Sequence, residues 1–444
     1  MSLKDFGKKY SPKIISALNK FSANVVIKTI MAGMARVLPV TLVGSIGLLI
    51  SNIPYEPYMN FITDIGLYKY LNLAATLTMD MISLYLVAAL AYEMARHYKK
   101  SAINAVILAT LCFLIVTPLT EAVIGESTAS VFTLTYFGAK GMFVAMFVAM
   151  IAVRLYVFLM EKGPKIKMHP SVPRAVTSSF ESLIPIAATA FVFILVSVIF
   201  SNTSYGDIHS FITLVLQKPL EGLGDSLTSL LILWVIGEIC WWFGINSSVT
   251  SPIMYGIFFP LAVANMSAYA AGDPLPYILT YSFAYTFKGP RHFVLSSMLA
   301  FMAKSKQLKA VGKVSFVPGI FGISEPMKFG IPMVFNPITL VPMILTPVVC
   351  TAIAYFAVYI EFMPRQGVDI LWTMPPILAG FLACGWQGAV VQVIQIVACF
   401  VIYLPFFKIL DKSKIREEEE QERKLELAKA KKEKSNEDLV GSAA

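Results

Sequence analysis

The sequence contains little charge. Asp, Glu, Lys and Arg make up 14% of its 444 residues, whereas about a quarter of a soluble protein is charged. Hydrophobic residues reach 57% instead. Histidine and cysteine are also scarce, with four and five residues, and no group of them has the spacing of metal ligands. No metal site is therefore expected, and we interpret the cysteines as small core residues.

Motifs of a nucleotide-driven enzyme are missing as well. The sequence contains no Walker A and no GxGxxG pattern, so neither a nucleotide engine nor any other cofactor is predicted. The net charge of +9 is not combined with aromatic stacking in a soluble domain, which makes nucleic acid a poor candidate partner. The same charge suits an anionic inner leaflet, so membrane lipid is an expected partner.

Long apolar runs predict an all-α polytopic membrane protein. With its flanks, each run reaches the roughly 20 residues that cross about 30 Å of hydrocarbon as a helix. The alternation of a β-barrel is absent, and backbone groups in lipid must be satisfied within the segment, so the spans are predicted to be helical. The clearest runs are Val40–Ile50, Phe143–Met160, Ile184–Phe200 and Gly388–Leu410.

The distribution of positive charge predicts the orientation of the spans. Residues 1–24 carry five lysines among apolar residues, which is typical of an amphipathic surface segment and not of a cleavable signal peptide. Basic clusters at Arg96–Lys100 and Lys162–Arg174 are expected on the same, cytoplasmic side. The first half is therefore predicted to contain spans at about 27–50, 72–95, 102–118, 140–160 and 182–201, and both termini are predicted to be cytoplasmic.

The second half of the sequence is less regular. Clean spans are predicted at 225–243, 337–360 and 386–410. Proline and glycine interrupt the other apolar stretches, at 251–271, 277–303, 315–335 and 374–385. Interrupted segments at membrane depth predict re-entrant hairpins or discontinuous helices that line a cavity. Residues 411–444 form a Glu/Lys-rich tail, either a solvated helix or disordered.

Two interrupted segments resemble each other. Trp242–Ser247 and Ile320–Pro326 share Phe-Gly-Ile, then a small polar residue, then helix breakers. Such pairs point to a transporter binding site, although a match this short also arises by coincidence. Glu325 is costly in an apolar stretch unless it faces a cavity, and a loop at the membrane edge is the alternative. Glu238 could bind substrate or form a structural hydrogen bond to a neighbouring helix.

The second of these segments carries a family resemblance. It lies between a lysine-rich loop and a Phe-Gly-Ile-Pro motif, and the order, spacing and most identities agree with the family over about 35 residues. The chain resembles the membrane (IIC) component of the lactose/cellobiose family of the bacterial phosphotransferase system. The matching stretches are Ala303–Lys313, Val317–Pro326 and Phe329–Pro337.

This resemblance implies about ten transmembrane helices plus re-entrant hairpins in a bacterial cell membrane. It implies a homodimer with a dimerisation half (25–222) and a sugar-transport half (223–410) that moves like an elevator. The chain would be the membrane subunit of a phosphotransferase, carrying a sugar, such as the β-linked disaccharide cellobiose, inward. A phosphocysteine on a separate IIB protein, itself supplied by IIA, would then phosphorylate the sugar. Glu325 would be the catalytic residue, because the family's glutamate at this position binds the sugar hydroxyl that accepts the phosphoryl group.

The sequence departs from the family pattern in three places. Asn246 and Ser247 replace His-Gly, and asparagine cannot relay a proton near pH 7. Ser324 replaces asparagine before Glu325. The third departure is Gly289-Pro290-Arg291-His292, where the family has a glycine-rich stretch.

These departures leave alternatives open. Arg291 and His292 could create an anion site, or the arginine could reach the cytoplasmic headgroups. Trp242 could stack on a sugar or belong to the interfacial belt. A permease of the same fold, uncoupled from phosphorylation and moving another polar or acidic solute, is the alternative function.

Overall fold

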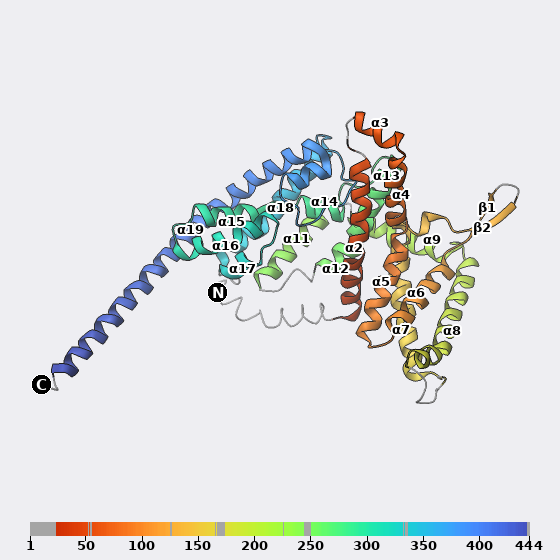
Figure 1. Cartoon of the computed structure of the whole chain (residues 1–444), viewed down its shortest axis with the longest axis horizontal. Helices are drawn as coiled ribbons and strands as arrows, with labels where there is room; N and C mark the ends of the chain where they lie inside the picture. The colour runs from red at the N-terminus through yellow and green to blue at the C-terminus, as the bar shows by residue number, and fades with distance from the viewer. Residues whose placement is uncertain are drawn as a thin grey trace.

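A computed structural model describes residues 24–51, 53, 56–124, 127–164, 166, 174–224, 226–243, 250–331, 333 and 336–441. Figure 1 shows an almost entirely helical molecule with one small hairpin of strands at its edge. The first group of elements is α2 (Val25–Ser51), α3 (Glu56–Asp64), α4 (Leu67–Met79), α5 (Ile82–His97), α6 (Ala102–Val116), β1 (Thr120–Ile124), β2 (Ser127–Val131), η1 (Leu134–Tyr136), η2 (Ala139–Gly141), α7 (Met142–Lys162), α8 (Arg174–Ser201), α9 (Ile208–Ile212), η3 (Thr213–Gln217) and α10 (Lys218–Gly224).

The second group contains the interrupted segments. Its elements are α11 (Leu227–Trp242), α12 (Ser251–Ile253), η5 (Met254–Phe258), α13 (Phe259–Ala271), α14 (Tyr281–Thr286), α15 (Arg291–Phe301), α16 (Lys306–Ile320), α17 (Glu325–Gly330), α18 (Pro337–Tyr359) and α19 (Leu378–Gly441). The predicted surface segment 1–24 lies outside the described residues except for its last position.

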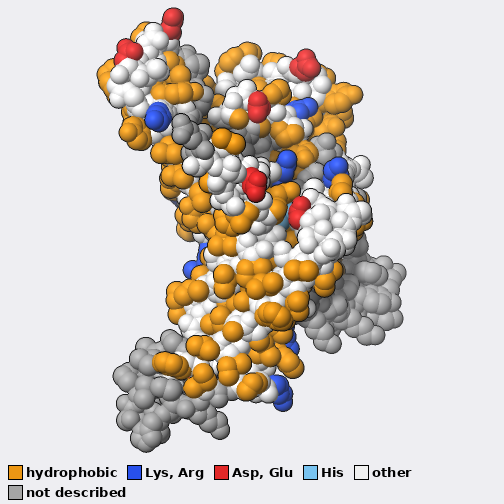
Figure 2. Space-filling view, turned by 90° about the vertical axis from the view of Figure 1, so that its right-hand side faces the viewer, with side chains coloured by type: hydrophobic (Ala, Val, Ile, Leu, Met, Phe, Trp, Pro, Cys, Tyr) orange, Lys and Arg blue, Asp and Glu red, His pale blue; other side chains and the backbone are white. Residues whose placement is uncertain are grey.

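Helix α5 forms the centre of the first group, where it packs against α2, α6 and α7. Its Leu86 and Leu90 side chains are fully buried. Gly33 of α2 allows the two helices to approach closely, because a Cβ there would lie 2.5 Å from Leu90 Cδ2. In contrast, the exposed α8 is mostly apolar, as Phe191 and Ile199 illustrate. Figure 2 shows hydrophobic side chains over much of one face of the molecule, as expected of a surface in contact with lipid.

Six helices in the described part of the chain are long and apolar enough to cross a membrane, or up to seven if a bent pair is one span. The prediction of about ten transmembrane helices is therefore not confirmed. The predicted spans 102–118 and 225–243 correspond to the shorter apolar helices α6 and α11.

The predicted span 72–95 needs a correction, because it is not a single straight helix. It is two helices, α4 and α5, which meet at an angle of 44°. The break is stabilised by the loop that enters α7, because the Ser83 backbone N–H donates to the Phe137 carbonyl at 2.7 Å. The Ser83 hydroxyl donates to the Gly138 carbonyl at 2.6 Å. Contacts from a remote loop thus replace the helical hydrogen bonds lost at the bend.

The opposite correction applies to 251–271, which was predicted to be broken. The structure forms one span from α12, η5 and α13. Both prolines lie in first turns, Pro252 in α12 and Pro260 in α13. Pro252 costs little because it lies at the start of the span, where its missing N–H would have no helical partner. Pro260 lies inside the span, where the π-helical turn just before it accommodates the missing N–H. A π-helical turn joins the two pieces.

The charged tail continues α19 as a helix to Gly441, well away from the other helices (Figure 1). Its first turns bind the loop before α16. The Asp411 carboxylate accepts hydrogen bonds from the backbone N–H groups of Lys304 and Ser305, at 3.1 and 2.9 Å. Glu418 accepts from the Ser305 hydroxyl at 2.7 Å and from the Gln307 N–H at 2.8 Å. Two tail carboxylates therefore satisfy orphan donors at the start of α16.

Candidate functional site

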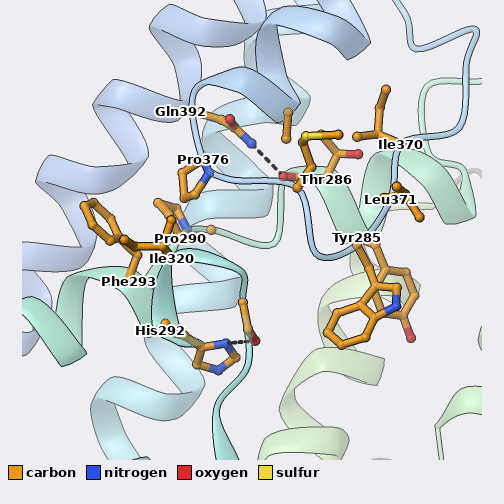
Figure 3. Close-up of a pocket in the computed structure, with 16 residues that line it drawn as sticks. Tyr285, Thr286, Pro290, His292, Phe293, Ile320, Ile370, Leu371, Pro376 and Gln392 are labelled. Atoms are coloured by element: carbon orange, nitrogen blue, oxygen red, sulfur yellow. Dashed lines mark hydrogen bonds between the residues drawn. The ribbon is translucent and has the colours of Figure 1, made fainter. Parts of the chain in front are cut away.

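A small cavity lies where the helix pair α14–α15 is interrupted (Figure 3). Its walls come from the interruption, the end of α16, the loop before α19, and α19 itself. The volume of about 80 Å³ has room for two or three waters at about 30 Å³ each. A sugar would therefore require these walls to separate.

Gly289 and Pro290 cause the interruption. Gly289 has a φ of +99°, which side-chain-bearing residues rarely adopt, and Pro290 has no N–H for a helical hydrogen bond. The Gly289 backbone also lies directly against Cys350 of α18, since a Cβ would be 2.6 Å from the Cys350 Sγ atom. The stretch 277–303 is thus a discontinuous helix, as predicted.

Two glutamines of α19 donate hydrogen bonds to carbonyl groups that lose their helical partners at the interruption. Gln392 Nε2 donates to the Thr286 carbonyl at 2.9 Å, and Gln395 Nε2 donates to the Phe287 carbonyl at 3.0 Å. The Gln392 Oε1 atom also accepts from the backbone N–H groups of Ile377 and Gly380, at 2.6 and 2.9 Å. One side chain therefore joins the interrupted helix to the start of α19 across the cavity (Figure 3). Sequence reasoning missed both residues, although glutamines inside an apolar span are a visible signal.

A buried ion cluster lies behind the interruption. Glu238 of α11 and Arg291 of α15 are 1% and 4% exposed, and their Oε1 and Nη2 atoms are 2.6 Å apart. Lys288 Nζ lies 3.5 Å from the same carboxylate oxygen and 4.0 Å from the centre of the Trp234 ring. The cluster joins two cations beside the interruption to one carboxylate on a neighbouring helix.

Arg291 has a second partner. Its Nη1 atom donates to the Met343 carbonyl of α18 at 3.3 Å. In a regular helix that carbonyl would accept from residue 347, which is a proline and has no N–H. The idea that Arg291 reaches the cytoplasmic headgroups is therefore wrong. Its guanidinium is buried because Glu238 and an orphan carbonyl both need a donor there.

His292 faces a different direction from Arg291. Its Nδ1 atom is 2.9 Å from the Gly322 carbonyl, in the loop between α16 and α17 (Figure 3). This contact holds the interruption against the loop that leads through the buried Ser324 to Glu325, the first residue of α17. The predicted positions His292, Ser324 and Glu325 are thus connected through this contact and this loop. The Glu325 side chain, and the predicted site residues Asn246 and Ser247, lie outside what the structure describes.

Trp242 is positioned by the segment that precedes α18. Its side chain is 4% exposed, and Nε1 donates to the Asn336 carbonyl at 2.8 Å. Asn336 caps α18 through its own side chain, which accepts from the Ile338 N–H at 3.0 Å. In this conformation the indole joins α11 to the start of α18.

The comparison with known proteins decides the family. The family model described as "Phosphotransferase system, EIIC" matches residues 31–347. The chain belongs to this family. It is a sugar permease of the phosphotransferase system and a multi-pass membrane protein, and components of this kind bind sugar and work with separate IIB and IIA proteins.

Several relatives match this EIIC chain over almost its full length. The oligo-beta-mannoside-specific EIIC component of Bacillus subtilis (strain 168) is 32% identical over 421 residues, covering 92% of this chain and 95% of the relative. The lichenan permease IIC component of the same organism is 31% identical, covering 91% and 94%. The cellobiose-specific EIIC component of Geobacillus stearothermophilus is 29% identical, covering 91% and 94%.

A solved structure matches this EIIC chain equally well. It is the transporter ChbC, the IIC component of the N,N'-diacetylchitobiose-specific phosphotransferase system. The TM-score is 0.87 at 32% identity, covering 93% of this chain and 99% of ChbC. The resemblance noted in the sequence is therefore confirmed. The comparisons do not support the alternative of a permease uncoupled from phosphorylation.

Proposed function

We propose that this EIIC protein carries a β-linked disaccharide or short oligosaccharide, with cellobiose as the first candidate. The relatives reported above are named for oligo-beta-mannoside, lichenan, cellobiose and N,N'-diacetylchitobiose. The units of these sugars are joined by β-glycosidic bonds. Their names agree on the linkage and differ in the sugar unit, so the linkage is the better supported part of the proposal.

Glu325 is the proposed catalytic residue. When the phosphoryl group leaves the IIB cysteine sulfur, a bond forms to a sugar hydroxyl oxygen, and the hydroxyl proton needs an acceptor. A carboxylate at position 325 can accept it as a general base. The observation that carries this proposal is the contact between His292 and the Gly322 carbonyl, which joins the cavity wall to the loop before Glu325.

The other predicted substrate contacts divide into two sets. Ser324 adjoins Glu325 in the sequence, and His292 contacts the loop before it. Asn246 and Ser247 replace residues of a motif whose histidine contacts sugar in the family that the chain resembles. We propose that all four bind the sugar. Glu238 and Arg291 instead pair with each other, so they are better suited to positioning the interruption. Trp242 could contact sugar only if its hydrogen bond to the segment before α18 opened.

The proposed movement is an elevator motion of the second group of helices against a dimer formed by the first group. The division into groups supports it, because the helix interrupted at Gly289–Pro290 and the loop before Glu325 both lie in the second group. The positive charges of the N-terminal segment, of residues 304–313 at the start of α16 and of the tail support two cytoplasmic termini and contact with anionic lipid. The start of α16 would then lie on the side from which IIB docks.

Uptake by reconstituted vesicles tests this function. Radiolabelled cellobiose is supplied outside, with phosphorylated IIB inside, and the product is analysed for sugar phosphate. We expect cellobiose phosphate to accumulate only with IIB, and Glu325→Gln to lower its rate by about 10²-fold or more. Glu121→Gln, an exposed carboxylate on β1, is the matched control and should retain the wild-type rate. Uptake of unmodified cellobiose without IIB would refute the proposal.

A further inference from the structure

A second, larger cavity lies at the other end of the second group. It is lined by the last turns of α13 and α18 and by the loops that follow them, and its volume is about 840 Å³. The small cavity beside Gly289 and Pro290 is about a tenth of that size. Ligand sites commonly measure about 300–1,000 Å³. This cavity is therefore large enough for several sugar units.

The position of this cavity relative to the membrane follows from α19. Helix α19 is broken at Cys384–Gly385, and its longer second part runs into the charged tail (Figure 1). Helix α18 is antiparallel to this second part, because Gln395 contacts Cys350 and Tyr403 contacts Thr346. The α18 end at Tyr359 therefore lies opposite the end from which the tail continues. The loops 272–280 and 360–377 contain three carboxylates, of which Asp369 is buried, and one arginine, whereas residues 302–313, around the start of α16 near the tail, are rich in lysine. A weakly acidic end opposite a basic one is the pattern of an outer face.

Tyrosine side chains form an open aromatic surface in the cavity. Tyr355 and Tyr359 lie one turn apart on α18, with their ring planes 19° apart and their centroids 6.1 Å apart. Tyr359 is 66% exposed. The third ring, Tyr269, is held by the Gly367 backbone, since a Cβ there would lie 2.6 Å from the tyrosine Cδ2 atom. The flat face of a tyrosine ring is electron-rich, and the C–H groups on one side of a pyranose ring carry a slight positive charge. The two surfaces therefore suit each other.

Two carboxylates provide hydrogen-bond acceptors beside the rings. Asp273 and Glu361 both line the cavity and are exposed. Among the described residues, neither carboxylate takes part in an ion pair with a Lys, Arg or His side chain. An ionised carboxylate offers about four acceptor positions, which sugar hydroxyls can fill. Acceptors beside aromatic faces are what a neutral polyhydroxylated ligand requires.

The two loops are fixed in position. Arg365 Nη1 donates to the Leu275 carbonyl and, at 3.0 Å, to the Pro276 carbonyl, so it ties the loop after α18 to the loop after α13. Glu361 has a φ of +61°, a conformation that non-glycine residues rarely adopt. The Met363 N–H holds this turn closed by donating to the Ala357 carbonyl at 2.9 Å. The platform is therefore formed before any ligand arrives, which lowers the entropic cost of binding.

We propose that this cavity is a capture site for β-linked oligosaccharides on the outer face, separate from the site near Glu325. The proposal rests on the proposed sugar-permease function. Tyr355 and Tyr359 would stack on sugar units while Asp273 and Glu361 accept hydrogen bonds from their hydroxyls. Longer chains would gain most from this site, because only they fill it.

Direct binding tests the capture site without relying on transport. Cellotetraose is titrated calorimetrically into detergent-solubilised Glu325→Gln protein, in which the proposed catalytic contact is removed. We expect binding to persist in this background and to weaken about tenfold when Tyr359→Ala or Glu361→Gln is added. Tyr70→Ala, which removes an equally exposed tyrosine of α4, and Glu121→Gln are the controls and should change nothing. Unchanged binding in both site variants, or no binding at all, would overturn the proposal.

Transport supplies a second readout. In vesicles, Tyr359→Ala and Glu361→Gln should raise the KM for cellotetraose about tenfold, leave kcat unchanged, and affect cellobiose less. If wild-type vesicles take up no β-glycoside, the proposed function fails, and the binding titration still decides the capture site. If the variants lower thermal stability without changing the KM, the tyrosines belong only to the interfacial belt and the capture site is refuted. Glu361→Gln keeps the size of the side chain, so it remains informative should Tyr359→Ala not fold.

Discussion

Removing the Glu238 carboxylate tests whether the buried ion cluster holds the interrupted helix in place. Glu238→Gln keeps the shape of the side chain but leaves Arg291 and Lys288 without their negative partner. The two residues of the short contact, Glu238 and Arg291, are 1% and 4% exposed, so solvent screens their interaction little.

The expected cost follows from this burial. Breaking a buried ion pair by removing one partner costs about 3–5 kcal/mol, because the remaining charge stays desolvated. The Lys288 side chain is 21% exposed and can shift its ammonium toward water, which reduces its share of the penalty. We therefore expect Glu238→Gln to lower the free energy of unfolding by about 3 kcal/mol.

The assay is denaturation of the purified protein at fixed detergent and protein concentration, followed by intrinsic fluorescence. Glu93→Gln is the matched control, because it breaks an ion pair with Arg36 that is partly exposed and should cost only about 0–1 kcal/mol. The double variant Glu238→Leu with Arg291→Leu should be less destabilised than the sum of the two single variants. A coupling of about 1–3 kcal/mol is expected for residues in direct contact.

Two results would contradict this reasoning. One is a Glu238→Gln protein as stable as Glu93→Gln to within about 0.5 kcal/mol. The other is additivity of the single variants, which would show that the two charges do not stabilise each other.

Three further predictions follow from the same structure. Gln392→Leu should lower the free energy of unfolding by about 3 kcal/mol, because it leaves the Thr286 carbonyl and two N–H groups without their side-chain partner. The control Gln421→Leu, on the exposed tail, should be neutral in the same denaturation assay. Gly289→Ala should reduce the folded yield in size-exclusion chromatography, because the added Cβ would meet Cys350 Sγ at 2.6 Å and the φ of +99° suits glycine. The control Gly256→Ala should fold normally, because a Cβ at that position has no atom within 4 Å. Burial lowers the pKa of His209 to about 4, against a smaller opposing effect of Asp207, so the unfolded chain binds this proton first as the pH falls below about 6.5. Stability should therefore fall by about 3 kcal/mol between pH 6.5 and 4, and His209→Gln should remove most of this dependence; an unchanged pH profile in the variant would assign the effect elsewhere.

The candidate site was partly predictable, because some of its features are local. Gly289 and Pro290 dictate an interruption wherever they occur in an apolar stretch, so the break within 277–303 was expected and is confirmed. Pro252 and Pro260 were misleading for the same local reason. A proline in the first turn, such as Pro252, does not break a helix, and a π-helical turn accommodates Pro260 inside the span; the sequence showed neither the helix start nor this turn.

The membrane class and the family follow from the sequence alone. Composition and long apolar runs require helices in a bilayer, because backbone groups in lipid have no other partners. The motif around Glu325 specifies the family because its residues are contiguous. Only the tertiary structure decided which residues pair with the charged and polar groups at the interruption. Glu238 pairs with Arg291, and Gln392 donates to the Thr286 carbonyl, from helices far apart in the chain. Such pairings depend on how the helices pack against one another, and no local pattern encodes that packing.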